Sequence, residues 1–231
     1  MDFDHKYFLN RKSGEGARLR QTDLGFEWVM KKRVSETLQS KKDIVFDFGC
    51  SDGYLLKLFD PTYFELHGLE INTMMQHIAG SKGIQMHTNI NDMEEIDIFL
   101  MRGVLHHLPD YLETFSQLLK VFLNSDRSRM QIFLLANPNA DSFLWRRFHR
   151  LPMVEEGDSF NSVYKVYSAK HLRDWFLKNG ARVEIAYPYL RTPYRKLSID
   201  LKSFLYCVAT NKYRRFAWPR NIFNMCITFV K

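Results

Sequence analysis

Short apolar runs alternate with amphipathic stretches along most of this chain. A run of four to eight apolar residues predicts a buried strand, whereas apolar residues three and four positions apart predict a helix. These patterns predict strands at 43–48, 64–69, 84–88, 96–101 and 130–135, with helices at 52–59, 72–81 and 110–123. Because most of these strands are separated by helices, the sequence predicts an α/β fold with a parallel sheet covered by helices on both faces.

The regular alternation changes after residue 135. Ala136-Asn137-Pro138-Asn139 predicts a turn, and a helix at 168–180 begins with Ser168 as its cap and stops at Gly180. Two further strands are predicted at 182–187 and 222–230. Near the start of the chain, an amphipathic helix is predicted at 22–40, where apolar residues share one face: Phe26, Val29, Met30 and Val34.

The segment Asp47-Phe48-Gly49-Cys50-Ser51-Asp52-Gly53 joins the first predicted strand to the first predicted helix. A strand, glycine turn and helix N-terminus together present backbone N–H groups to a ligand. We expect a Cβ at Gly49 or Gly53 to strike that ligand. A pyrophosphate site favours a further glycine where this chain has Ser51, which argues against a dinucleotide. Asp47 supplies a carboxylate for a ligand ammonium group or for fixing the loop.

Glu70 ends the next predicted strand, 17 residues after Gly53. That separation fits one helix and one strand, and a carboxylate at this place can accept hydrogen bonds from the hydroxyls of a ribose. The carboxyl ends of parallel strands meet at one edge, where ligands bind, and Arg102 and Asn137 are expected at the same edge. The two acids therefore favour a nucleoside that carries an amino-acid tail and no phosphate.

The ordered segments resemble the class I, Rossmann-like S-adenosylmethionine (SAM)-dependent methyltransferases over roughly residues 40–187. The segments that carry the resemblance are DFGCSDG at 47–53, GLE at 68–70, IQMHT at 84–88, IDIFLM at 96–101 and VLHHLPD at 104–110. The resemblance implies a doubly wound, mostly parallel seven-stranded sheet. It also implies SAM as methyl donor and S-adenosylhomocysteine (SAH) as product. It is closest to small-molecule O-methyltransferases of the ubiquinone and menaquinone pathways and of glycan modification.

The resemblance also implies a set of cofactor-binding residues. Ile71 is expected to pack on the adenine, and one of Asn89, Ile90 and Asn91 is expected to bind the adenine amino group. Arg102 is expected either to approach the methionine carboxylate or to lie on the surface. The whole set is Asp47, Gly49, Cys50, Ser51, Gly53, Glu70, Ile71, Asn89, Ile90 and Arg102.

His106 and His107 follow the fourth predicted strand and are the candidate catalytic residues. Imidazole titrates near neutral pH and can take the proton of an acceptor hydroxyl. His106 is the first choice as base, with an apparent pKa near 6.5 expected in the rate profile, and His107 is the candidate structural anchor. The reverse assignment stays open. We expect no metal, because no His, Cys or Asp cluster has ligand spacing.

The remaining sequence features concern organisation and partners. Residues 1–40 are expected to form an arm and lid helix, and 41–231 the methyltransferase domain, with 138–167 and 188–221 as a substrate cap. The three cysteines are widely spaced, and the sequence has neither an apolar run of about 18 residues nor a signal-peptide pattern. We therefore expect the protein in the reducing cytoplasm.

Charged residues are unevenly distributed along the chain, which bears on the kind of methyl acceptor. Residues 145–231 hold 17 of the 33 Lys and Arg residues but 6 of the 26 Asp and Glu residues. A basic C-terminal third favours an anionic partner: a phosphate-bearing small molecule, such as a nucleotide-sugar or a lipid-linked polysaccharide precursor, an anionic lipid, or RNA. The alternative is a solvated surface that binds no anion. The leading hypothesis is O-methylation of a small metabolite. RNA methylation and a non-catalytic SAM-binding module are the alternatives.

Overall fold

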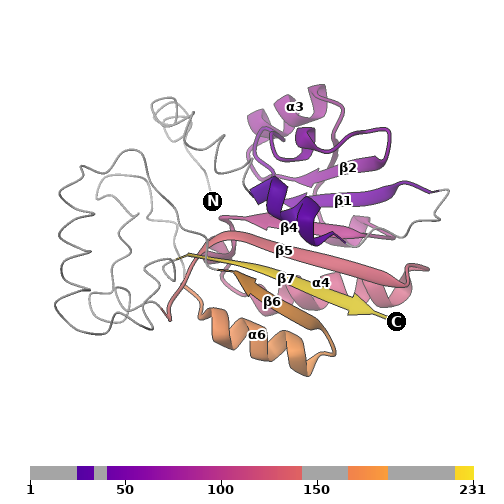
Figure 1. Ribbon diagram of the computed structural model, residues 1–231. Helices are drawn as coiled ribbons and strands as arrows, with labels where there is room; N and C mark the ends of the chain where they lie inside the picture. The colour runs from indigo at the N-terminus through magenta and orange to yellow at the C-terminus, as the bar shows by residue number, and fades with distance from the viewer. Residues whose placement is uncertain (1–24, 34–40, 142–165, 187–221) are drawn as a thin grey trace, which may run out of the picture.

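The computed structural model describes residues 25–33, 41–141, 166–186 and 222–231. These residues form a seven-stranded sheet of order β3-β2-β1-β4-β5-β7-β6, in which β7 runs antiparallel to its neighbours (Figure 1). The strands are β1 (Asp43–Phe48), β2 (Phe64–Leu69), β3 (Gln85–His87), β4 (Ile98–Arg102), β5 (Arg129–Pro138), β6 (Arg182–Ala186) and β7 (Ile222–Val230). The predicted α/β, doubly wound and mostly parallel sheet is confirmed.

Helices cover both faces of this sheet (Figure 1). The α-helices are α3 (Thr73–Ser81), α4 (Tyr111–Asn124) and α6 (Ala169–Lys178), and short 3-10 turns are η2 (Leu56–Leu58), η3 (Ile90–Asp92) and η4 (Leu105–His107). One apolar layer joins the sheet to α4 and α6 through Phe115 and Phe176. The other layer joins the opposite face to α3 and to helical residues 25–32 through Ala79 and Val29.

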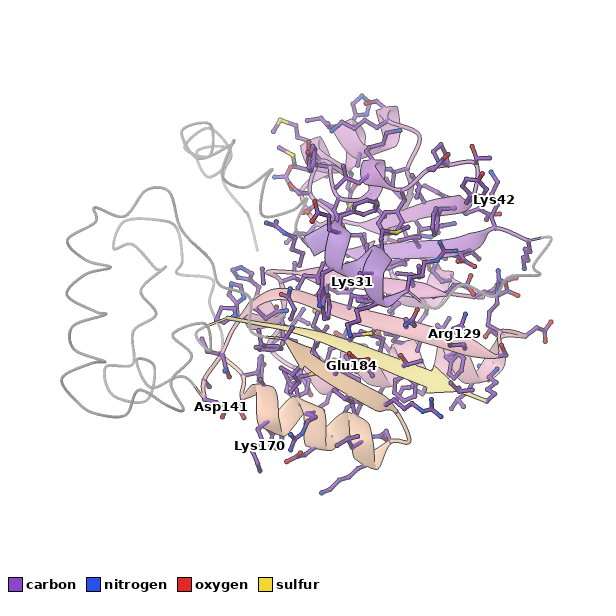
Figure 2. All side chains as sticks on the ribbon, in the orientation of Figure 1. Lys31, Lys42, Arg129, Asp141, Lys170 and Glu184 are labelled. Carbon is purple, nitrogen blue, oxygen red and sulfur yellow. The ribbon has the colours of Figure 1, made fainter. Side chains whose placement is uncertain are left out.

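The order of the strands reverses between β1 and β4, which are both parallel to their neighbours. In open α/β sheets such a reversal leaves a crevice beyond the carboxyl ends of the strands. Figure 2 shows both ends of the sheet, with Lys42 and Arg129 beside the amino ends of β1 and β5, and Asp141 just past the carboxyl end of β5.

The amino ends of the central strands are joined by charges that are buried or half-buried. Arg127 is 6% exposed and donates to Glu95 Oε2 at 2.9 Å, while its second contact is with Asp97 Oδ2 at 3.3 Å. The same Asp97 oxygen accepts from the Ile44 backbone N–H at 2.7 Å. These contacts connect the beginnings of β1, β4 and β5, so this end of the sheet has its charges paired.

Three sequence predictions need correction or fall outside the described residues. The helix predicted at 52–59 is a series of turns around η2, because Gly53 has a positive φ of 77° and Phe59 is extended, which leaves too few residues for a stable α-helix. The turn predicted at 136–139 is the end of β5, which continues to Pro138 through a bulge. Residues 1–24 and 34–40 of the proposed arm and lid helix, and residues 142–165 and 188–221 of the proposed cap, lie outside the described residues.

Gly49 and Gly53 serve the packing of the protein itself. Both have positive φ, 79° and 77°. A Cβ on Gly49 would meet Val104 Cγ2 at 2.5 Å, and one on Gly53 would meet Ile84 Cδ1 at 2.1 Å. Both glycines are therefore required by packing within the protein, which the sequence pattern alone did not indicate, and their close approach to a ligand stays a prediction.

We predict that Gly53→Ala lowers the free energy of unfolding by about 2–5 kcal/mol, because backbone strain adds to overpacking against Ile84. Gly83→Ala is the matched control, since Gly83 has φ 81° but a Cβ there would meet nothing within 4 Å. The control should lose only about 1–2 kcal/mol. Urea denaturation measures the free energy of unfolding of both variants. Adding Ile84→Val, which removes Cδ1, to Gly53→Ala should recover part of the lost stability. Equal losses in the two glycine variants would contradict the packing explanation.

Candidate functional site

Asp47 lies at the carboxyl end of β1 and is 3% exposed. Its Oδ1 atom is buried and has no hydrogen-bond partner. Burial raises the pKa of the Asp47 carboxyl to about 7, the Arg102 guanidinium opposes this rise, and the Glu70 carboxylate adds to it. A buried carboxylate without a full set of partners is costly, and a cationic ligand group would offset that cost.

Glu70 follows β2 and connects two loops through its side chain. Oε2 accepts from the Ser51 backbone N–H at 2.9 Å, and Oε1 accepts from the Asn72 backbone N–H at 2.9 Å. Each carboxylate oxygen has a further lone pair, so ligand hydroxyls can still be accepted. Glu70 therefore shapes the loop after β1 as well as presenting a negative charge, a structural role that sequence spacing did not predict.

In the loop after β1, the Cys50 side chain is not accessible to a ligand. Cys50 is 5% exposed and packs in the apolar layer, and a Cβ on Gly68 would meet its Sγ at 2.7 Å. Burial raises the pKa of the Cys50 thiol, so the sulfur stays protonated. Ser51 has φ 54°, and its N–H faces Glu70. Cys50 can thus meet a ligand only through its backbone.

The residues proposed for the adenine divide into exposed and buried ones. Ile71 is 55% exposed beside Glu70 and is available to a flat apolar ligand. Asn89 is the N-cap of η3, where its Oδ1 accepts from the Asn91 N–H at 3.0 Å. Ile90 is 2% exposed and packs under α4 in the apolar layer. Among these candidates the side chains of Ile71, Asn89 and Asn91 are exposed, whereas that of Ile90 is enclosed in the apolar layer.

Arg102 ends β4 and pairs in register with Leu135 of β5. It is half-buried, and its charge lies close enough to Asp47 to act against the raised pKa of that carboxyl. Asp47, Glu70 and Arg102 therefore belong to one electrostatic group at the ends of β1, β2 and β4. Such a group offers both signs of charge to a zwitterionic ligand.

His106 and His107 both lie in η4, just after β4, with ring centroids 4.1 Å apart. His106 is 6% exposed, whereas His107 is half-buried. Burial lowers the pKa of His106 to about 3, and the charge of His107 adds to this shift. Burial therefore disfavours the imidazolium form of His106, whereas the sequence led us to expect an apparent pKa near 6.5 in the rate profile.

Asn137 is a candidate that the sequence placed at this edge without assigning it a role. The residue is fully buried near the end of β5, and neither atom of its side-chain amide has a hydrogen-bond partner. The sequence signal was its place directly after the apolar run of β5, which the expectation of a simple turn obscured. Asp47 and Asn137 thus bring buried polar atoms without partners to the same edge of the sheet.

Two general features of the described residues concern metal ions and membranes. Within those ranges, no group of three or more His, Cys, Asp or Glu side chains is arranged to hold a metal ion. In the same part of the chain, no helix is long and apolar enough to cross a membrane.

Comparison with known proteins agrees with this arrangement. The family model described as "Methyltransferase domain" matches residues 27–185. Among solved structures, a SAM-dependent methyltransferase from Archaeoglobus fulgidus has a TM-score of 0.58 at 16% identity, covering 99% of this chain and 100% of that one. The corresponding protein from Aquifex aeolicus has a TM-score of 0.56 at 14% identity and covers 100% of both chains.

A third similar structure is the plantazolicin methyltransferase BpumL in complex with SAH, with a TM-score of 0.58 at 14% identity. The match covers 96% of this chain and 87% of that one. At these identities the solved structures establish the likeness of the fold. A search of the curated proteins found no match to this sequence.

We predict that Asp47→Asn raises the free energy of unfolding at pH 8. The folded parent keeps the Asp47 proton up to pH about 7, whereas the unfolded chain releases it near 3.8. The parent therefore loses stability as pH rises between these values, by up to about 4 kcal/mol, and the neutral variant does not. Urea denaturation of both proteins at pH 4, 6 and 8 measures the difference, which should grow with pH and level off above 7. A difference that does not change with pH would show that Asp47 is ionised throughout.

Proposed function

Because this chain belongs to the methyltransferase domain family, we propose that it binds SAM at the edge formed by β1, β2 and β4 and methylates a hydroxyl group of a small molecule. The observation that carries this proposal is the buried Asp47 carboxylate, whose Oδ1 has no partner, beside Glu70 and Arg102. SAM supplies an ammonium, a carboxylate and a ribose in one molecule. These groups match the charges and hydrogen-bonding capacity of the three side chains.

Each residue has a proposed part in binding. Asp47 would hold the ammonium group, which stabilises the ionised carboxylate that burial otherwise disfavours. Glu70 would accept from the ribose hydroxyls with the lone pairs that Ser51 and Asn72 leave available. Ile71 would cover the adenine, and Arg102 would meet the methionine carboxylate. Gly49 and Gly53 would act indirectly, by letting the loop pack against Val104 and Ile84.

For proton transfer we propose His107 rather than His106. A general base must accept a proton near the working pH, and a group with a pKa of about 3 does this poorly. His107 is the more exposed of the two rings and lies beside the first, with centroids 4.1 Å apart. The neutral, buried His106 would fix the position of His107, and alignment with exclusion of water would supply the rest of catalysis.

The acceptor we propose is a small metabolite, sugar or lipid-linked polysaccharide precursor that is methylated on oxygen. The half-buried imidazole of His107, just after β4, supports an acceptor whose proton must leave, as with a hydroxyl. RNA methylation depends on the basic segment 145–231, most of which lies outside the described residues, so it stays a sequence prediction. The non-catalytic alternative also stays open to test.

Two measurements test the proposal. Titration calorimetry with SAM and SAH tests the cofactor, and failure of both to bind would refute it. Incubation with methyl-labelled SAM and a panel of sugars, phenols, lipid-linked sugars, amines, thiols and RNA then tests the acceptor. Label transfer to the hydroxyl compounds is expected. Label found only in RNA, or only in amines or thiols, would exclude the proposed acceptor class.

We predict that Glu70→Ala weakens SAH binding by about ten- to a hundredfold, because charge-assisted hydrogen bonds to ribose are lost. The loop contacts of Glu70 would be lost too, so the ribose assignment needs its own control. The parent should bind the 2′-deoxy analogue of SAH roughly tenfold more weakly than SAH, whereas Glu70→Ala should scarcely distinguish them. Calorimetry gives all four dissociation constants. Undiminished discrimination in the variant would remove the ribose role and leave only the loop role.

We predict that His107→Ala lowers kcat by roughly 10²–10⁴ while SAH affinity stays nearly unchanged. The matched variant is His106→Phe, which keeps a buried ring next to His107 and should lose less activity. Comparison of kcat from pH 5 to 9 with the labelled acceptor supplies a second readout. Any pH dependence of kcat in the parent should persist in His106→Phe and disappear in His107→Ala. The opposite pattern would return the role of base to His106.

A further inference from the structure

Two neighbouring asparagines near the end of β5 are both fully buried but differ in their hydrogen bonding. Asn139 Oδ1 accepts from the backbone N–H groups of Asp141 at 3.0 Å and Ala169 at 3.2 Å, which explains its burial. The side-chain amide of Asn137 has no partner at either its oxygen or its nitrogen. A buried amide left without partners destabilises the fold, so this one needs an explanation.

A bulge in β5 directs the Asn137 side chain. The register with β7 passes from Leu134 opposite Met225 to Asn137 opposite Phe223, so that two residues of β5 face Asn224 alone. Ala136 has φ 53°, and its N–H donates to Asn224 Oδ1 at 2.8 Å. Strict alternation would place residue 137 on the face of Leu135. The extra residue instead places Asn137 on the face of Phe223, which is the face covered by α4 and α6.

The same face and edge of the sheet carry the histidine pair. The turn η4, which holds His106 and His107, contacts β5, and Leu105 of that turn packs in the apolar layer of Phe223. The left-handed conformation at Ala136 and the unpartnered amide at Asn137 both reduce stability at adjacent positions. Costs of this kind are kept where a side chain must be held for a ligand.

We propose that the Asn137 carboxamide binds a neutral polar group of the methyl acceptor, and that the bulge held by Asn224 positions it there. This inference rests on the proposed function and adds the acceptor side of the same site. A carboxamide donates through Nδ2 and accepts through Oδ1, which suits a hydroxyl or an amide. In a buried setting a neutral group selects a neutral partner, because an unpaired carboxylate or ammonium would be desolvated at greater cost.

The test uses Asn137→Leu, which removes the polar atoms at similar volume, with Asn139→Leu as matched control. Asn137→Leu should raise Tm by roughly 2–4 °C or more, because an unsatisfied buried amide disappears. Asn139→Leu should lower Tm, because two backbone N–H groups lose their acceptor. Calorimetry should give nearly the same SAH affinity for Asn137→Leu and the parent.

Nuclear magnetic resonance of the Asn137 side-chain NH₂, assigned by its loss in Asn137→Leu, supplies the binding readout. In the presence of SAH, acetamide or ethylene glycol should shift this signal saturably, and acetate should not. Asn137→Leu lacks the signal, so its binding of the neutral probe is measured by calorimetry and should be roughly tenfold or more weaker than that of the parent. The proposal is overturned if neither neutral probe moves the signal, if SAH alone produces the full shift, or if Asn137→Leu loses stability as Asn139→Leu does. Failure of the proposed function would be recognised separately, as absence of SAH binding by the parent.

Discussion

The place of β1 between β2 and β4 is the constraint on which the rest of this structure depends. The chain passes from β1 to β2 on one side and returns to β4 on the other, so the loops after these strands diverge at one edge. Asp47 ends the most central of these strands and is buried by its neighbours on both sides. Two further proposed ligand contacts are positioned relative to it, because Arg102 ends β4 and Glu70 follows β2, the two strands that pair with β1.

The two ends of the sheet differ in how their polar groups are satisfied. At the amino ends, Arg127, Glu95 and Asp97 pair with one another and with the backbone of Ile44. At the carboxyl ends, Asp47 Oδ1 and the Asn137 amide are buried without partners. The paired end stabilises the fold, whereas the unpaired end reduces its stability and leaves capacity for a ligand. This asymmetry supports assignment of the binding site to the carboxyl edge independently of any motif.

The loop after β1 is shaped by the protein before any ligand arrives. Glu70 accepts from Ser51 and Asn72, while Gly49 and Gly53 make room for Val104 and Ile84. The loop is therefore preorganised by contacts from β2, from the segment after β4 and from the segment before β3. Preorganisation of this kind lowers the entropy cost of binding, which is one reason why glycine and acid at these positions serve affinity without necessarily touching the ligand.

The sequence by itself determined the strands, most of the helices and the family resemblance, because burial periodicity and turn residues are local properties of the chain. It predicted all seven strands, nearly to the residue for β1, β2 and β7. Only the tertiary structure decided what surrounds each candidate side chain. The burial of His106, the neighbours of Gly53 and the bulge that turns Asn137 depend on contacts between segments far apart in the chain. Such contacts produce no periodic pattern in the sequence. The sequence pattern can therefore place a residue at the edge of the sheet, but it does not show whether the side chain contacts solvent, a ligand or the core.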